Sequence, residues 1–171
     1  MNRFSFLVRR LTLPFLLSFP SIVVKKELTP ISLPQPQVTG GKPLMQALNE
    51  RRSMRRFGPQ SLSLSVLSNL LWAAYGINRM EQGKRTTPSA GNRQEIDIYV
   101  VMTCGAYRYE AKNHCLCPVL GVDIRSLAGR NRFVSEAPVN LVFVADLALF
   151  NKKNESDKII YSAADVGFAS Q

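Results

Sequence analysis

Histidine and cysteine are scarce in this chain of 171 residues, which holds one histidine, His114, and three cysteines. With a single histidine, no Ser–His–Asp or Cys–His catalytic set is evident, which argues against a hydrolase. A structural zinc site needs about four converging ligands, and an odd number of cysteines does not close into a disulfide framework. We therefore expect no metal site, and we interpret Cys115 and Cys117 as thiols that happen to lie in a β-hairpin.

Acidic residues are also few, since 12 Asp and Glu stand against 22 Lys and Arg for a net charge of +10. The excess is uneven. Residues 1–56 hold ten basic and two acidic residues, whereas residues 57–171 hold twelve and ten. A DNA- or RNA-binding surface spreads basic residues over the folded domain. We therefore expect no nucleic-acid partner.

No apolar run is long enough to span a bilayer comfortably. The run at residues 11–24 follows a basic start, which is typical of a secretory signal. We interpret residues 1–24 as a signal-like or anchor segment, and an uncleaved anchor would be the one contact with a membrane. The protein would then be exported, as a periplasmic or membrane-associated protein; without a functional leader it would be cytoplasmic.

Residues 25–42 are rich in proline and glycine, and we expect them to form an extended tether before a domain at residues 43–171. Pro43 should open a short helix with Arg51 and Arg52 in its last turn. Ser63 or Ser65 should cap a second helix, which Gly76 should end. The predicted buried stripe of this second helix comprises Leu64, Leu67, Leu70, Leu71 and Ala74.

Residues 77–94 are interpreted as a polar loop. After them, alternation of apolar and polar residues predicts a strand over 96–102, and a hairpin should follow over 107–119. Residues 139–145 are nearly all apolar, which predicts a buried central strand. Residues 159–171 predict a helix whose small residues let another helix approach closely.

Four arginines and a serine are concentrated in residues 51–56. A guanidinium presents a planar fork of donors that matches a phosphate, and a serine hydroxyl adds another donor. The alternative is a solvated run of charge at a helix end.

The second concentrated motif is TPSAGNRQ, residues 87–94. Asn92 and Gln94 each place a donor beside an acceptor, which suits the edge of a heterocycle. An ordinary Pro-Ser-Gly turn is the alternative. Together the two motifs predict a nucleotide-like cofactor site, in which one motif holds a phosphate and the other contacts a ring.

At these residues the chain resembles the nitroreductase family of FMN-dependent oxidoreductases, and it is most similar to the branch with the peptide-azoline dehydrogenases. The resemblance runs from about Lys42 to Gln171. Besides the two motifs it takes in LLWAAYG at 70–76, EIDIYV at 95–100, EAPVNL at 136–141 and AADVG at 163–167.

The resemblance implies an α+β fold with a central, mainly antiparallel sheet flanked by helices, and a homodimer with long interface helices and flavin between the subunits. Family members continue beyond the point where this chain stops in mid-helix, so we expect the domain to be incomplete at its C-terminus. No catalytic side chain is expected, because the flavin carries the redox chemistry. The phosphate and ribityl contacts implied are Arg51, Arg52, Ser53 and Arg55; the ring contacts are Pro88, Ser89, Ala90, Asn92 and Gln94, with Asn92 at the polar pyrimidine edge.

The implied activity is hydride transfer through FMN, from NADH or NADPH to a nitroaromatic, quinone or similar small-molecule acceptor. Export would favour another electron donor or the dehydrogenation of a heterocycle, because the nicotinamide pool is cytoplasmic. The remaining alternative is a truncated, non-catalytic relative that binds flavin or only dimerises.

Overall fold

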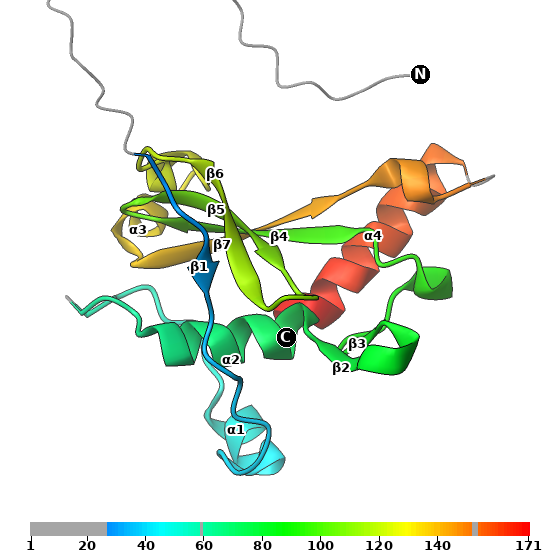
Figure 1. Ribbon diagram of the computed structural model, residues 1–171, viewed down its shortest axis with the longest axis horizontal. Helices are drawn as coiled ribbons and strands as arrows, with labels where there is room; N and C mark the ends of the chain where they lie inside the picture. Colours follow the sequence, from blue (N-terminus) through cyan, green and yellow to red (C-terminus); the bar gives the residue numbers. More distant parts are fainter. Residues whose placement is uncertain (1–26, 59, 152–153) are drawn as a thin grey trace, which may run out of the picture.

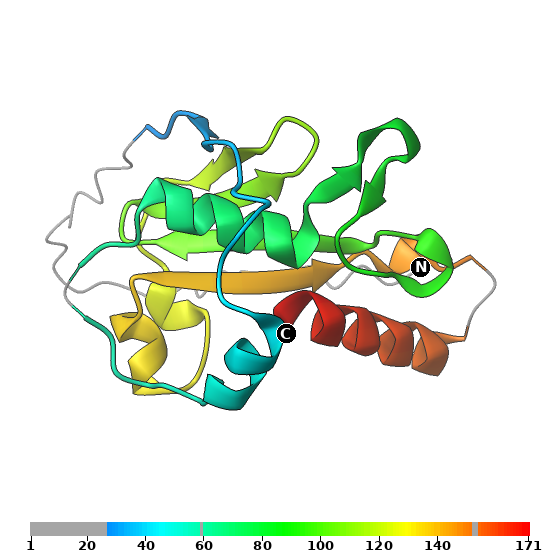
Figure 2. The ribbon, with the colours of Figure 1, turned by 90° about the horizontal axis from the view of Figure 1, so that it is seen from below.

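The computed structural model describes residues 27–58, 60–151 and 154–171, so the predicted leader lies outside the described residues. A five-stranded sheet has the order β1-β6-β5-β4-β7, and every neighbouring pair is antiparallel. Two helices cover one face of it (Figures 1 and 2). This arrangement confirms the expected α+β fold. The strands are β1 (Ile31–Ser32), β4 (Ile96–Met102), β5 (Gly105–Glu110), β6 (Cys115–Leu120) and β7 (Val139–Ala145), and the helices are α2 (Leu64–Tyr75) and α4 (Glu155–Ser170).

The shorter elements lie around this sheet. None of the helices in the described ranges has both the length and the apolar character needed to cross a membrane. The remaining elements are α1 (Leu44–Glu50), β2 (Ile77–Arg79), η1 (Met80–Gln82), β3 (Lys84–Arg85), η2 (Ala90–Asn92), η3 (Arg125–Leu127), α3 (Arg132–Glu136) and η4 (Leu147–Leu149).

The core lies between α2 and the sheet. In β4 the alternating residues Ile96, Ile98 and Val100 are no more than 2% exposed. They belong to one cluster with Leu67 and Leu71 of α2. Burying such a side chain contributes roughly 1.5–3 kcal/mol, so this interface fixes α2 on the sheet.

Local signals place the ends of α2 correctly. Ser63 is the N-cap, and its Oγ accepts from Val66 N at 3.3 Å. Gly76 is the C-cap. The predicted stripe is only partly right, because Leu64 and Leu70 are 46% and 43% exposed. Ser68 and Tyr75 are buried instead, so the buried face is turned around the helix axis toward these two residues.

The strand at residues 139–145 was predicted to be central, and that prediction is wrong. Strand β7 pairs along its whole length with β4 but stands at the edge of the sheet. Its residues are half-buried, and Val144 is exposed. A continuous apolar run indicates contacts on both faces of a strand, but it carries no information on how many strands lie beside it.

The last helix, α4, is packed on one side only. It begins at Glu155, four residues before the predicted start, where the Oδ1 atom of Asn154 accepts from Asp157 N at 2.7 Å. The buried residues of α4 are Ser162, Asp165 and Ala169. The other side is open in this chain, and its exposed residues are Ile159, Ile160, Ala163, Ala164, Gly167 and Phe168.

Candidate cofactor site

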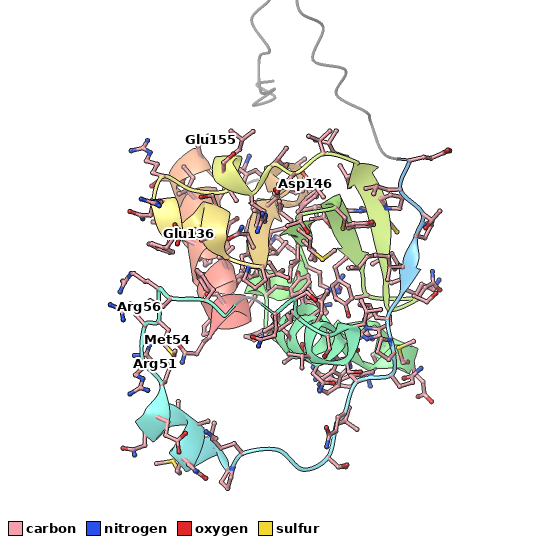
Figure 3. All side chains as sticks on the ribbon, turned by 90° about the vertical axis from the view of Figure 1, so that its left-hand side faces the viewer. Arg51, Met54, Arg56, Glu136, Asp146 and Glu155 are labelled. Atoms are coloured by element: carbon pink, nitrogen blue, oxygen red, sulfur yellow. The ribbon has the colours of Figure 1, made fainter. Side chains whose placement is uncertain are left out.

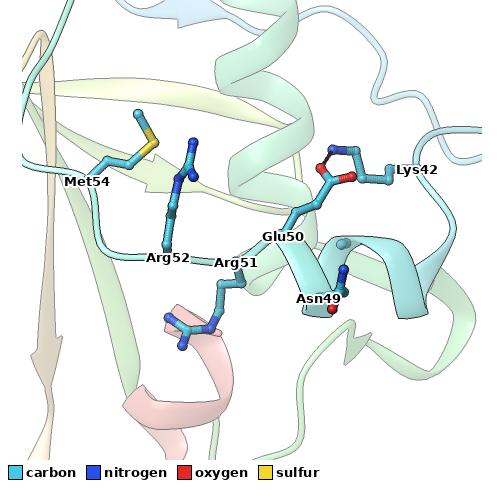
Figure 4. A pocket seen from close by; sticks show the side chains of 7 residues that line it. Lys42, Asn49, Glu50, Arg51, Arg52 and Met54 are labelled. Atoms are coloured by element: carbon cyan, nitrogen blue, oxygen red, sulfur yellow. Dashed lines mark hydrogen bonds and ion pairs between the residues drawn. The ribbon is translucent and has the colours of Figure 1, made fainter.

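The arginine segment, residues 51–56, leaves α1 as exposed chain without regular secondary structure. Helix α1 ends at Glu50, and Arg51 already has extended dihedrals (φ −60°, ψ 125°). The prediction that Arg51 and Arg52 lie in the last helical turn is therefore wrong. Figure 3 shows the segment at the surface, and Figure 4 shows Arg51 on one side of the backbone and Arg52 and Met54 on the other. This alternation is what an extended chain produces.

The guanidinium groups of the arginine segment form no ion pair within the described part of the chain. Arg55 is in cation–π contact, with its guanidinium carbon 5.8 Å from the Phe133 ring centroid. Beside the segment, Lys42 and Gln46 donate to the Glu50 carboxylate, and these hydrogen bonds lower the pKa of Glu50. Arg51 and Arg52 also line an open hollow of about 800 Å³ (Figure 4). Several unpaired cations at one place form a natural site for an anion.

The second predicted motif contains a loop, residues 88–94, in an unusual backbone conformation. Gly91, Asn92 and Gln94 all have positive φ, at 64°, 54° and 53°. Such a conformation in a residue other than glycine costs roughly 1–3 kcal/mol and persists only where the surroundings impose it. Here Ser89 imposes it, because its carbonyl accepts from Asn92 N at 2.9 Å and its Oγ accepts from Gln94 N at 3.0 Å.

Gln94 holds Asn92 in place and has little capacity left for a ligand. Its Oε1 accepts from Arg85 Nε at 2.9 Å. Its Nε2 donates to the Gly83 carbonyl at 2.9 Å and to Asn92 Oδ1 at 3.3 Å. The assignment of Gln94 as a ring contact stays a prediction. The groups of the loop still able to meet a ligand are the exposed Asn92 amide and the Ser89 hydroxyl hydrogen.

Beneath the loop lie two buried acids, of which the sequence indicated neither as functional. Asp165 of α4 is 5% exposed, and its Oδ2 accepts from Ala90 N at 2.8 Å. Glu95, directly before β4, is 2% exposed. Burial raises the pKa of Glu95, and the neighbouring Asp165 carboxyl raises it further. The sequence gives no sign of the contact between Asp165 and Ala90, because the two residues are 75 positions apart.

His114, the one histidine, also has partners that the sequence did not reveal. Its Nε2 lies 2.6 Å from Ser68 Oγ, and its Nδ1 lies 2.9 Å from the Tyr109 hydroxyl. Ser68 gives its only hydrogen to the Pro34 carbonyl at 2.5 Å, so the arrangement fits a neutral ring that donates from Nε2 to Ser68 and accepts at Nδ1 from Tyr109. Burial favours this neutral form and lowers the pKa of His114. This network joins the chain before α2, α2 itself and the β5–β6 hairpin.

This network predicts a loss of stability on mild acidification. The pKa of His114 in the folded protein is below its ordinary value of 6.5. The neutral ring therefore stabilises the fold fully above pH 6.5, and this stabilisation is lost as the pH falls from there through the lowered pKa. We expect the wild-type melting temperature to fall between about pH 7 and pH 5 relative to that of His114→Asn, which does not titrate in this range. Asparagine tolerates the positive φ of 48° at this position. A constant difference in melting temperature across the range would contradict the prediction.

The two predicted halves of the site are separate within one chain. No hydrogen bond or ion pair among the described residues joins the arginine segment to residues 88–94. Figures 1 and 2 agree on this, with α1 well apart from the β2–β3 hairpin that precedes the loop. The assignment of both segments to one cofactor therefore stays a prediction.

Comparisons with known proteins identify relatives of this chain. Residues 48–171 match the sequence profile of the Nitroreductase family. A Methanocaldococcus jannaschii protein assigned to the nitroreductases is 30% identical over 138 residues, which is 75% of this chain and 69% of the relative. A crystal structure from Ralstonia eutropha, also assigned to the nitroreductases, is 42% identical with a TM-score of 0.77, over 82% of this chain and 67% of the other.

A more distant structure supports the fold alone. One chain of the Escherichia coli microcin synthetase McbBCD complex is 18% identical with a TM-score of 0.56, over 92% of this chain and 67% of the other. The profile match and the 30% identical relative identify the family of the chain, beyond its fold. On this evidence, the chain belongs to the nitroreductase family of oxidoreductases.

Proposed function

We propose that this protein is an FMN-dependent oxidoreductase that takes hydride from NADH or NADPH and passes electrons to a nitroaromatic, quinone or similar acceptor. The observation that carries the proposal is a pair of unused donor sets. The arginine segment has no ion-pair partner among the described residues. In residues 88–94, the oxygens of Asn92 and Ser89 accept hydrogen bonds from Gln94, while the Asn92 NH2 group and the Ser89 hydroxyl hydrogen remain as donors in a strained but well-fixed conformation.

The arginine segment suits the phosphate of FMN. A terminal phosphate with two negative charges binds most strongly to forked, charged donors. In an extended chain, Arg51, Ser53 and Arg55 lie on one side, so these three would hold the phosphate and the adjoining ribityl hydroxyls. Arg52 lies opposite Arg51 in Figure 4 and would contribute mainly through its charge.

The loop suits the ring of FMN. We assign the polar pyrimidine edge to the Asn92 side chain, which Gln94 orients, and a second contact to the Ser89 hydroxyl. Pro88 and Ala90 would lie along the ring through their backbone and apolar atoms. When bound, the flavin supplies the hydride chemistry, and the protein residues bind and orient it.

A homodimer would bring the two halves together. The two halves are apart in one chain, and the open side of α4 presents Ile159, Ile160 and Phe168 at 60%, 62% and 56% exposure. Apolar side chains clustered on one exposed helix side are typical of a subunit interface. We propose that a second copy packs here, so that each cofactor contacts residues of both subunits.

The test is reconstitution with FMN followed by reduction. We expect the purified chain to bind FMN and to show a yellow flavin absorbance that NADH or NADPH bleaches under nitrogen. A nitroaromatic or quinone should then restore the colour. A protein that binds FMN but is not bleached by either nucleotide would favour a flavin dehydrogenase with another reductant or a non-catalytic flavin binder. A protein that FMN cannot reconstitute would refute the proposal.

A further inference from the structure

Four buried polar atoms lie without a partner near the place where α2, β4 and α4 meet. Within the described residues, the Tyr75 hydroxyl, both carboxyl oxygens of Glu95 and Ser162 Oγ form no hydrogen bond. All three residues are at least nine-tenths buried, at 3%, 2% and 7% exposure. A buried polar atom without a partner costs roughly 1–3 kcal/mol, so this group needs a physical explanation.

Asp165 connects this buried group to the loop above it. It stands one turn after Ser162 on the inner side of α4, and its Oδ2 accepts the Ala90 amide at 2.8 Å. Asp165 also acts on Glu95, because burial raises the pKa of Glu95 and the neighbouring Asp165 carboxyl raises it further. The residues that hold the loop and the unpartnered carboxyl are therefore next to each other.

The nearby arginines do not neutralise the two acids. Arg93 faces Glu95, but its guanidinium donates to the Ala90 carbonyl and stands 5.1 Å over the Phe150 ring. Arg85 stands 4.1 Å over the Tyr75 ring and donates to the Tyr75 carbonyl and to Gln94. Neither arginine forms an ion pair in the described structure. Tyr75 is uncharged at neutral pH, and burial raises its pKa further above neutral.

Two neighbouring carboxyl groups inside a protein do not both ionise readily, because like charges repel strongly where water is excluded. One proton resolves the difficulty. A protonated Glu95 is a donor, and the Asp165 carboxylate beside it is an acceptor with a free oxygen. The resulting short, charge-assisted bond satisfies the Glu95 carboxyl and restrains the Asp165 side chain.

We propose that Glu95 and Asp165 share one proton, and that this acid pair positions the loop of residues 88–94 by fixing the acceptor of the Ala90 amide. Loss of the proton places two negative charges together and drives Asp165 away from its partner. The Ala90 amide then loses its acceptor, and the loop loosens. The pair exists whether or not a cofactor binds; only its value to flavin binding rests on the proposed function.

The test follows the Ala90 amide of the full chain by NMR from about pH 5 to pH 8, a range above the ordinary Glu pKa of 4.5. In the wild type, its resonance should titrate as Glu95 ionises. Glu95→Gln keeps a donor and removes the titration, so its profile should be flat. Asp165→Asn keeps an acceptor for Ala90 and removes the like charge, so the midpoint should move to lower pH. Asp97→Asn, at a half-buried acid of β4 that pairs with Arg108, is the matched control and should leave the profile unchanged.

Three results would overturn the proposal: no titration of the Ala90 resonance in the wild type, the same titration in Glu95→Gln, or a midpoint that Asp165→Asn does not lower. The last result decides the matter if Glu95→Gln fails to fold. In a parallel experiment, the FMN affinity of the wild type should fall roughly fivefold to tenfold with rising pH, which is the effect of losing one hydrogen bond. The FMN affinity of Glu95→Gln should stay constant. A wild type that binds no FMN at any pH would refute the proposed function, and the Ala90 titration would still decide the acid pair.

Discussion

Replacement of Arg51 and Arg55 together by alanine is expected to weaken FMN binding about 100-fold or more, with little change in the stability of the fold. A hydrogen bond to a charged group is worth roughly 1.5–3 kcal/mol, so the loss of two such donors accounts for this factor. The fold should persist because both residues are exposed and neither forms an ion pair in the described structure. FMN titration followed by flavin fluorescence measures the affinity, and thermal unfolding measures the stability.

The matched control replaces Arg52 and Arg56 by alanine. It removes the same amount of charge, but from the other side of the same segment. If the phosphate contacts one side, this second double variant should weaken FMN binding by no more than about tenfold, through long-range attraction alone. Equal losses in the two double variants would contradict the one-sided clamp and indicate a general effect of charge.

Leu71→Ala is expected to cost about 2–5 kcal/mol of unfolding free energy, the range for emptying a well-packed leucine site. Leu71 is fully buried and belongs to the cluster that joins α2 to the sheet. Urea unfolding followed by circular dichroism gives the free energy. The same change should also reduce FMN binding at temperatures near the melting point, because α2 carries Tyr75, whose carbonyl and ring hold Arg85.

Leu70 supplies the control for this prediction, since it is the adjacent residue of the same helix and is 43% exposed. Leu70→Ala removes the same atoms and has the same helix propensity, but it should cost less than about 1 kcal/mol because part of the side chain already contacts water. Equal losses at the two positions would contradict the observed orientation of α2.

Local patterns predicted those features that depend on neighbours in the sequence. Ser63 and Gly76 mark the ends of α2 because a cap needs a side chain or a free backbone group within a few residues. The alternation in β4 likewise records which side chains face the core. By contrast, the edge position of β7 depends on which strands pair, and the extended conformation of Arg51 depends on how the chain leaves α1. Neither feature has a local signal.

The candidate site divides in the same way. The hydrogen bond from Gln94 to Asn92 links residues two positions apart, within one sequence motif. The Ser68–His114 contact and the Ala90–Asp165 contact join residues 46 and 75 positions apart. No single sequence records such contacts, because serine, histidine and aspartate are ordinary residues wherever they stand alone. Glu95 is similar: its burial follows from α4 lying over the start of β4, which composition does not reveal.

The hydrogen bond that the Gly83 carbonyl accepts from Gln94 affects where a label can be attached to the protein. Gly41 and Gly83 look equally suitable for an inserted peptide tag or a dye, since both have positive φ and a Cβ at either would meet nothing within 4 Å. They differ in their carbonyl groups, because that of Gly83 accepts the Gln94 amide that also orients Asn92. A tag at Gly83 would therefore disturb the loop that contains Gln94, eleven residues away, whereas residues 40–41 are exposed and offer the safer point of attachment.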